Sequence, residues 1–271
     1  MKRSGWNPTR RNRNIGTAKS GHGLANRLVI PAPWNDPRVF WEKLHEPVAI
    51  EINGFTILVE PCLPGFVHSV TVDDLVRMLG LLPPHDIAAL RTVVLRQPTR
   101  KQGVLAAVWG RLAYFADFGR ARGPAIILDA QRLAGCLEWG RHLSPDVAEE
   151  LERLRTDGHT VTGENRRWRI QTSMVSTRST QLFRTVPHEL GHHVQYDREV
   201  RQRAGGDMDA ELALRDHYFT KPAREKEDFA HRYARETMER LSAEHRVPFP
   251  RLVEETSMKR WCLEPKWFGL A

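Results

Sequence analysis

The chain has 271 residues, of which 41% are hydrophobic, and 41 Lys and Arg against 33 Asp and Glu give a formal net charge of +8. This length and composition suffice for a buried core, and no apolar run reaches the roughly 18 residues that predict a membrane-spanning helix. No secretory signal follows the N-terminus, so we expect a cytoplasmic protein with no membrane partner.

Basic residues concentrate in the first 30 positions, which hold seven Lys and Arg and no acidic residue. These residues account for all but one unit of the net charge. The segment is polar and rich in Gly and Asn, and it lacks the apolar content needed to fold. We therefore expect residues 1–35 to form a flexible basic arm. The arm is either a solvated tail or, through residues 1–30, a contact for nucleic acid.

The next segment predicts a hairpin and then a short helix. Apolar runs at 48–53 and 55–60 flank Asn53-Gly54, a strong hairpin turn signal. Thr71 and Asp74 have the spacing of a capping box, and they precede an apolar stripe that two prolines end.

The remaining elements predict an α+β fold with a twisted mixed sheet. We expect strands at 91–96, 108–115 and 124–129, a helix at 145–156 and a strand at 168–174. We divide the chain into the arm 1–35, the hairpin and helix region 36–85, and a main domain 86–271. Whether 36–85 is a recognition module or packs on the core stays open.

One short motif contains candidate metal ligands and a candidate general base: His188-Glu189-Leu190-Gly191-His192. Two histidines at i and i+4 of a helix leave the same face, so both imidazoles can reach one metal ion, and Glu189 can serve as a general base. Gly191 is a poor helix former, which favours close approach of another segment. Pro187 predicts a kink, or a helix that starts near Thr185.

A second helix is predicted at 224–242 from apolar residues at helical spacing. Glu227 turns toward its buried face, where an unpaired carboxylate is costly, and coordination to a cation would remove that cost. The competing interpretation is that Glu225, Glu227 and Asp228 are acidic only because a helix dipole favours acids in the first turn.

The HELGH motif followed by Glu227-Asp228-Phe229-Ala230 resembles the gluzincin metallopeptidases, including the ImmA/IrrE-type and anthrax-lethal-factor-like groups. The resemblance implies a zincin-like domain whose third zinc ligand is a Glu on a second helix. The lethal-factor-like pattern maps this ligand to Glu227, and the ImmA-type pattern maps it to Glu225.

The chain departs from related zinc-enzyme patterns at several positions. The metzincin extension would require Gly at 195 and His at 198, where the chain has Gln and Arg. The zincins that use a third His leave His217 as an alternative ligand, although their surrounding pattern is missing. No Asp stands four residues after Glu227, so a thermolysin-type partner for the histidine is not evident.

We interpret the chain as a zinc metallopeptidase, a hydrolase that cleaves a protein or peptide substrate. Zn²⁺ is expected on His188, His192 and Glu227, with Glu189 as general base. The candidate donors to the developing oxyanion are Tyr218 and His217, which precede Glu227 by nine and ten residues. The lethal-factor-like group is similar in placing a Tyr shortly before the ligand Glu, which favours Tyr218. Two other classes stay open: a nucleic-acid-associated regulatory or repair protein that uses the arm, and a non-catalytic module with a structural zinc.

Four further expectations concern the surroundings of this motif. Residues 168–174 or 125–129 are candidates for a sheet edge that pairs with an extended peptide. Residues 198–209, with Gly205-Gly206, predict a loop over the cleft. The C-terminal aromatics Trp261, Trp267 and Phe268 are expected to pack over the core. The three cysteines are far apart in sequence and predict reduced, packed thiols.

Overall fold

The computed structural model describes residues 39–40, 43–99, 109–132, 135–164 and 166–270. The predicted arm 1–35 lies outside these residues, as does position 108 of one predicted strand. Contacts divide the chain into Met1–Val39 and Phe40–Ala271. No helix in the described part is long and apolar enough to cross a membrane.

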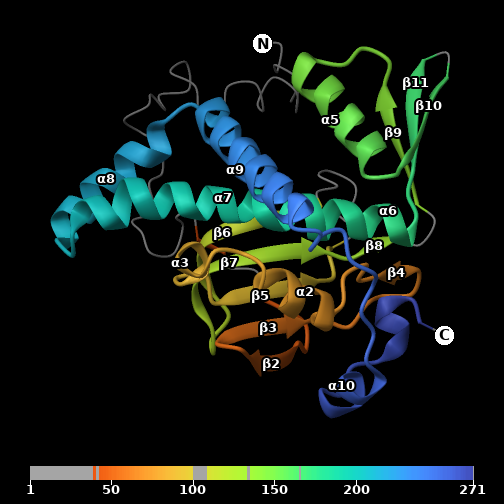
Figure 1. Cartoon of the computed structure of the whole chain (residues 1–271), viewed down its shortest axis with the longest axis horizontal. Coiled ribbons are helices and arrows are strands. Elements are labelled where there is room, and N and C mark those ends of the chain that lie inside the picture. Colours follow the sequence, from red (N-terminus) through yellow and green to blue (C-terminus); the bar gives the residue numbers. More distant parts are fainter. Residues whose placement is uncertain (1–38, 41–42, 100–108, 133–134, 165, 271) are drawn as a thin grey trace, which may run out of the picture. The chain divides into compact units, whose positions relative to one another are not determined.

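The protein has an α+β fold built on a six-stranded mixed sheet (Figure 1). The strand order is β1-β6-β7-β5-β3-β2, in which β3, β5 and β7 run parallel and the hairpin β2–β3 and the pair β6–β7 are antiparallel. These strands are β1 Val39–Phe40, β2 Val48–Ile52, β3 Phe55–Val59, β5 Thr92–Arg96, β6 Gly110–Asp117 and β7 Arg122–Asp129.

The region 43–85 contributes to the main sheet and to its apolar core. Its strands β2 and β3 belong to the main sheet, and the hairpin turns at Asn53 and Gly54 with φ of 51° and 82°, as predicted. Helix α2 (Val72–Leu79) has the predicted capping box of Thr71 and Asp74 and packs into the same apolar cluster. The short helix α3 (Pro84–Ile87) follows it.

A second, three-stranded antiparallel sheet has the order β10-β11-β9. Its strands are β9 Cys136–Gly140, β10 Thr160–Glu164 and β11 Arg167–Gln171, and helix α5 Pro145–Thr156 covers it through Leu151 and Leu154. The helix has its predicted bounds, but the predicted strand 168–174 ends at Gln171. A two-stranded ribbon pairs β4 Phe66–Val67 with β8 Gln131–Arg132.

Neither of the two candidate segments is a sheet edge. Strand β11 lies between β10 and β9, and β7 lies between β6 and β5, so each is paired on both sides. The sequence shows which strands are apolar, but strand order follows from long-range packing that no local pattern encodes.

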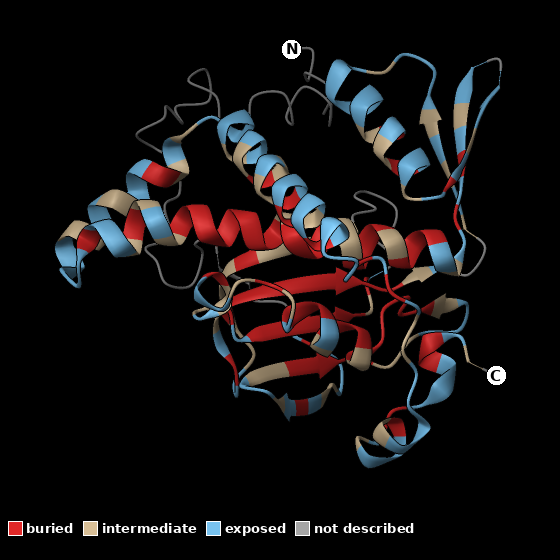
Figure 2. Ribbon diagram, in the orientation of Figure 1, coloured by how far each residue is buried: buried red, intermediate tan, exposed pale blue. Residues whose placement is uncertain are grey.

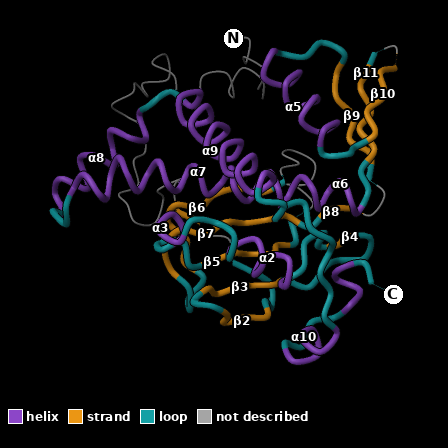
Figure 3. Tube along the Cα trace, in the orientation of Figure 1, coloured by secondary structure: helices purple, strands orange, loops and turns teal. Residues whose placement is uncertain are grey.

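One nearly continuous helical segment crosses the main sheet (Figure 3). It comprises α6 Met174–Arg178, the π-helix η3 Ser179–Thr185, α7 Val186–Tyr196 and the π-helix η4 Asp197–Gln202. Pro187 is the second residue of α7, which begins where η3 ends, and the Val186 N–H donates to the Gln181 carbonyl. The helical backbone thus begins about ten residues before the predicted start, and the π-turn widens the ladder where proline cannot donate.

The predicted loop at 198–209 is also wrong, because η4 continues the helix to Gln202. Only a short turn follows, where Gly205 and Gly206 adopt positive φ, and α8 (Met208–Thr220) begins at once. Helix α9 (Ala223–Ala243) then crosses α7, and it matches the predicted helix 224–242 (Figure 1).

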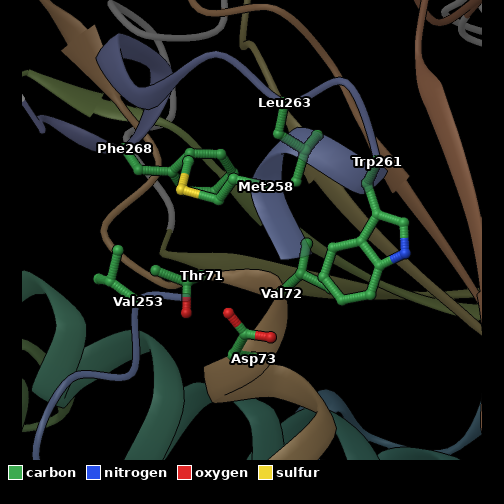
Figure 4. Close-up of a pocket in the computed structure, with 8 residues that line it drawn as sticks. All are labelled: Thr71, Val72, Asp73, Val253, Met258, Trp261, Leu263 and Phe268. Atoms are coloured by element: carbon green, nitrogen blue, oxygen red, sulfur yellow. The ribbon is translucent and has the colours of Figure 1, made fainter. Parts of the chain in front are cut away.

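The C-terminal segment packs over the core, as predicted. Trp267 and Phe268, in the 3₁₀-helix η5 (Pro265–Phe268), join the main apolar cluster, and helix α10 (Glu255–Arg260) contributes Met258. Figure 4 shows Met258 and Phe268 facing the start of α2 around a cavity of about 10 Å³. A cavity of this size holds at most about one water molecule, so it is no ligand site.

All three cysteines are free. Cys62 packs with its Sγ 3.6 Å from the Trp267 carbonyl oxygen, whereas Cys136 and Cys262 are exposed. The prediction of packed thiols therefore holds for Cys62 alone.

Candidate metal centre

Helix α7 is held in the core by an apolar stripe. Val186, Leu190 and Val194, spaced four residues apart, are each no more than 2% exposed and pack on the main sheet and α2. Figure 2 shows this helix buried over most of its length. The stripe fixes the rotation of α7, and with it the direction in which His188 and His192 leave the helix.

Helix α9 meets α7 at a contact between small residues. A Cβ added to Gly191 would lie 2.9 Å from the Ala230 Cα and 3.1 Å from the Ala230 carbonyl oxygen. Real Cβ atoms essentially never come that close to backbone, so only glycine allows the two helices this separation. This contact is the close approach that Gly191 predicted from the sequence.

The crossing brings three predicted side chains together. His188 Nε2 lies 3.3 Å from Glu227 Oε2, and His192 Nε2 lies 3.5 Å from Glu227 Oε1. Hydrogen bonds from His188 and His192 hold the pKa of the Glu227 carboxyl well below its ordinary value. The carboxylate is therefore ionised at neutral pH, the form in which it would bind a cation.

The two alternative ligands lie elsewhere. Glu225 accepts a hydrogen bond from Lys221 Nζ at 2.6 Å, and Lys221 also pairs with Glu199. His217 is exposed on α8. Neither belongs to the group that surrounds Glu227.

A fourth side chain, which the sequence reasoning missed, joins this group. The ligand atoms of His188, Glu227 and His231 lie within 4.8 Å of one another. The rings of His188 and His231 have centroids 4.5 Å apart. Burial, followed by the neighbouring His188, lowers the pKa of His231 to about 4, so its imidazole is neutral at pH 7. The signal was present in the sequence, because His231 follows Glu227 at i+4.

Glu189 lies beside the group and is only 8% exposed. Its Oε2 accepts a hydrogen bond of 2.7 Å from the Leu112 N–H, which ties the helix to strand β6. Burial raises the pKa of this carboxyl above its ordinary value, and the two neighbouring histidines oppose the shift. A carboxylate with a raised pKa is a better proton acceptor near neutral pH.

Strand β6 also supplies Tyr114, a second residue that sequence reasoning missed. The register of β6 against β7 shifts between Ala113 and Ala116, and such bulges turn a side chain out of the regular strand pattern. Burial, the Tyr218 hydroxyl and the carboxylates of Glu189 and Glu227 raise the pKa of Tyr114 well above its ordinary value. Tyr114 is therefore protonated at neutral pH.

Tyr218, the predicted oxyanion donor, is buried on α8 in an aromatic cluster. Its hydroxyl lies 3.1 Å from the Tyr114 hydroxyl. Burial raises the pKa of Tyr218 to about 12. Its catalytic role stays a prediction, and the contact with Tyr114 is the route by which it would reach the carboxylates.

The neighbouring His193 points away from the group. It lines a polar cavity of about 180 Å³ between α3 and α7, together with Asp86 and Asp197. Burial lowers the pKa of His193 to about 4, so it is neutral at pH 7. The 100° rotation per helical residue predicts this placement.

In comparisons with known proteins, no family model, no curated protein and no solved structure matches this chain.

Proposed function

We propose that this chain is a zinc-dependent metallopeptidase of the zincin-like type, which hydrolyses peptide bonds in a protein partner. The observation that supports it best is the convergence of His188 Nε2 and His192 Nε2 on the two oxygens of Glu227, at 3.3 and 3.5 Å. Metal–ligand bonds of about 2.0–2.2 Å place neighbouring ligand atoms of a tetrahedral site roughly 3.4 Å apart. The two distances to the Glu227 carboxylate are close to this spacing, and they support a site for a divalent cation, for which zinc is our proposal.

The same three residues would hold the cation. When bound, it supplies Lewis-acid activation of a water molecule and of the substrate carbonyl. Two neutral imidazoles and one carboxylate make the ligand set found in many catalytic zinc sites, in which three protein ligands leave one position open.

Glu189 would take the proton from the attacking water. The Leu112 N–H fixes its Oε2 and leaves Oε1 as the atom that accepts the proton. Burial favours the protonated form that results. Glu189 then returns the proton to the leaving amine, which a carboxyl with a raised pKa does readily.

Tyr114 would donate to the oxygen of the scissile carbonyl as it gains charge. It remains protonated, and the charges of Glu189 and Glu227 contribute to raising its pKa. The Tyr218 hydroxyl, 3.1 Å away, would orient it. This assignment places the donor on β6, the strand that also contacts Glu189, with the predicted Tyr218 behind it.

The test combines metal analysis with an assay on fluorogenic peptide pools and on cell lysate. We expect about one zinc per chain, hydrolysis that a chelator abolishes, and recovery when zinc is returned. Glu189→Gln is expected to keep zinc and to lose 10²–10⁴-fold in hydrolysis rate, the usual contribution of a general base. Zinc retained with full activity in Glu189→Gln would refute this role.

A matched pair separates the two acidic residues of α9. Glu227→Gln removes the carboxylate that faces both histidines, so zinc affinity should fall at least about tenfold. Glu225→Gln changes only the ion pair with Lys221 and should bind zinc as the unmodified chain does. A silent Glu189→Gln combined with unfolding on zinc removal would instead indicate a structural zinc.

A further inference from the structure

The two helices at the centre carry the same local pattern. On α7, His188 is followed three residues later by Gly191 and four residues later by His192. On α9, Glu227 is followed three residues later by Ala230 and four residues later by His231. In each helix a ligand-type residue, two others, a small residue and a histidine stand in that order.

The small residues of the two patterns touch, because a Cβ on Gly191 would lie 2.9 Å from the Ala230 Cα. The two patterns therefore meet where the helices cross. The pair His188 and His192 on α7 and the pair Glu227 and His231 on α9 both project beside this contact. Two side chains from each helix face the same space. The sequence analysis predicted both members of the first pair as ligands, but only Glu227 of the second pair.

The fourth member lies within reach of the same cation. Ligand atoms of His188, Glu227 and His231 lie within 4.8 Å of one another, and the His188 ring centroid is 4.8 Å from that of His192 and 4.5 Å from that of His231. The His231 ring is thus as near to His188 as the accepted partner His192. The 4.8 Å limit exceeds the roughly 3.4 Å spacing of a tetrahedral site, so coordination would draw these side chains closer together.

The alternative role for such a histidine is to orient His188 by bonding to its second ring nitrogen. The buried His188 Nδ1 has no hydrogen-bond partner among the described residues, so His231 does not hold it. A direct place among the ligands fits the geometry better than an orienting one.

We propose that His231 is a fourth protein ligand of the same divalent cation, which makes a closed site of three imidazoles and one carboxylate. This inference rests on the metal site of the proposed function. Four protein ligands leave no position for water, which is typical of a structural or resting site. Hydrolysis would then require His231, which is half-buried on α9, to leave the cation.

The test is X-ray absorption spectroscopy of the zinc-loaded full chain, which counts imidazole ligands without any assay of activity. We expect three imidazoles in the unmodified chain and two in His231→Ala, whose zinc affinity should fall at least about tenfold. His217→Ala, which removes an exposed histidine on α8, should keep three. Two imidazoles in the unmodified chain would overturn the proposal, and this result does not depend on whether any variant folds.

A second readout uses the cobalt-loaded protein and azide, a small anion that occupies an open coordination position. The visible spectrum of the unmodified chain should not respond to azide, whereas that of His231→Ala should shift. An equal response in both would count against a fourth ligand. Failure of peptide hydrolysis would leave the count of three imidazoles standing, so the proposed function and this inference fail separately.

Discussion

The two helices that form the centre are anchored in different ways. Helix α7 is buried over most of its length, whereas α9 exposes most of its surface, as Figure 2 shows. The ligand side chains follow the same division, since the Glu227 side chain is 52% exposed and that of His192 only 11%. The core therefore fixes the α7 half of the centre, which carries His188 and His192. The α9 half, which carries Glu227 and His231, is held against α7 by a few contacts.

The buried half depends on an ion pair at its start. Arg178 at the end of α6 donates from Nε and Nη2 to both oxygens of Asp74, at 2.9 and 2.7 Å. Asp74 is fully buried, and Arg178 also donates to the carbonyls of Phe249 and Pro250. This network joins α2, the segment that leads into α7, and the C-terminal chain.

The largest effect is expected from Asp74→Ala. It leaves the Arg178 guanidinium buried without its counter-charge, which typically costs 3–5 kcal/mol of unfolding free energy. Denaturant unfolding measures it. Glu255→Ala, which removes an exposed ion pair with Lys259, is the control and should show no measurable change. Equal losses in the two variants would contradict the importance of the buried network.

The contact between the two halves is tested by Gly191→Ala. In an open helix this change stabilises by up to about 1 kcal/mol, but here the new methyl group meets Ala230, so we expect a loss of about 1–3 kcal/mol and weaker zinc binding. Gly80→Ala at the end of α2 is the matched control. Its Cβ would meet carbonyl oxygens at 3.4 and 3.5 Å, an ordinary distance, so it should be tolerated.

A smaller effect is expected where α9 is tied to α3. The Tyr233 hydroxyl donates to Asp86 Oδ2 at 2.8 Å. Tyr233→Phe removes this hydrogen bond and should lower the unfolding free energy by about 1 kcal/mol. Zinc affinity, measured by competition with a chelator, should fall only slightly. A collapse of zinc binding would mean that Tyr233, and not the Gly191 contact, holds α9 in place.

The last effect is absent at neutral pH and appears only in acid. His159 is buried with its Nε2 2.9 Å from Thr180 Oγ1 of η3, and burial followed by the charge of Arg184 lowers its pKa to about 4. The unfolded chain takes up this proton near pH 6.5 and the folded chain only near pH 4, so stability is present above pH 6.5 and is lost between these values.

Uptake of this single proton changes the free energy of unfolding by at most about 1.4 kcal/mol per pH unit. His159→Gln should therefore flatten the dependence of unfolding free energy on pH between 6.5 and 4, and His217→Gln should not. Denaturant midpoints at several pH values measure the slope. Parallel slopes in His159→Gln and the unmodified chain would assign the acid sensitivity to other buried histidines.

Local signals in the sequence predicted the elements that depend on local chemistry. Asn53-Gly54 gave the hairpin, the Thr71 and Asp74 spacing gave α2, and the prediction for α5 had its observed bounds. The HExxH pattern also places His188 and His192 on one helix face, because helical spacing alone decides that.

The rest depends on contacts between distant segments. Tyr114 lies at a bulge in β6, where it contacts Tyr218, and a bulge leaves no mark in a run of apolar residues. His231 joins the candidate ligands only because α9 packs on α7. The close contact between Gly191 and Ala230 allows that packing. The π-helices were missed because their backbone hydrogen bonds depend on tertiary packing and not on propensity.

The π-helix η3 lies between Arg178 and the histidines that face the metal site, so the number of residues in this stretch is critical for the site. Each helical residue turns the backbone by about 100°, so the number of residues between Arg178 and His188 sets the angle between the Asp74-facing and the α9-facing sides. Where the winding does not adjust, removing one residue from Ser179–Thr185 would turn His188 and His192 by about 100° around the helix axis relative to Arg178. The two histidines would then lose their alignment with α9, while every residue of the HExxH motif remained in the sequence.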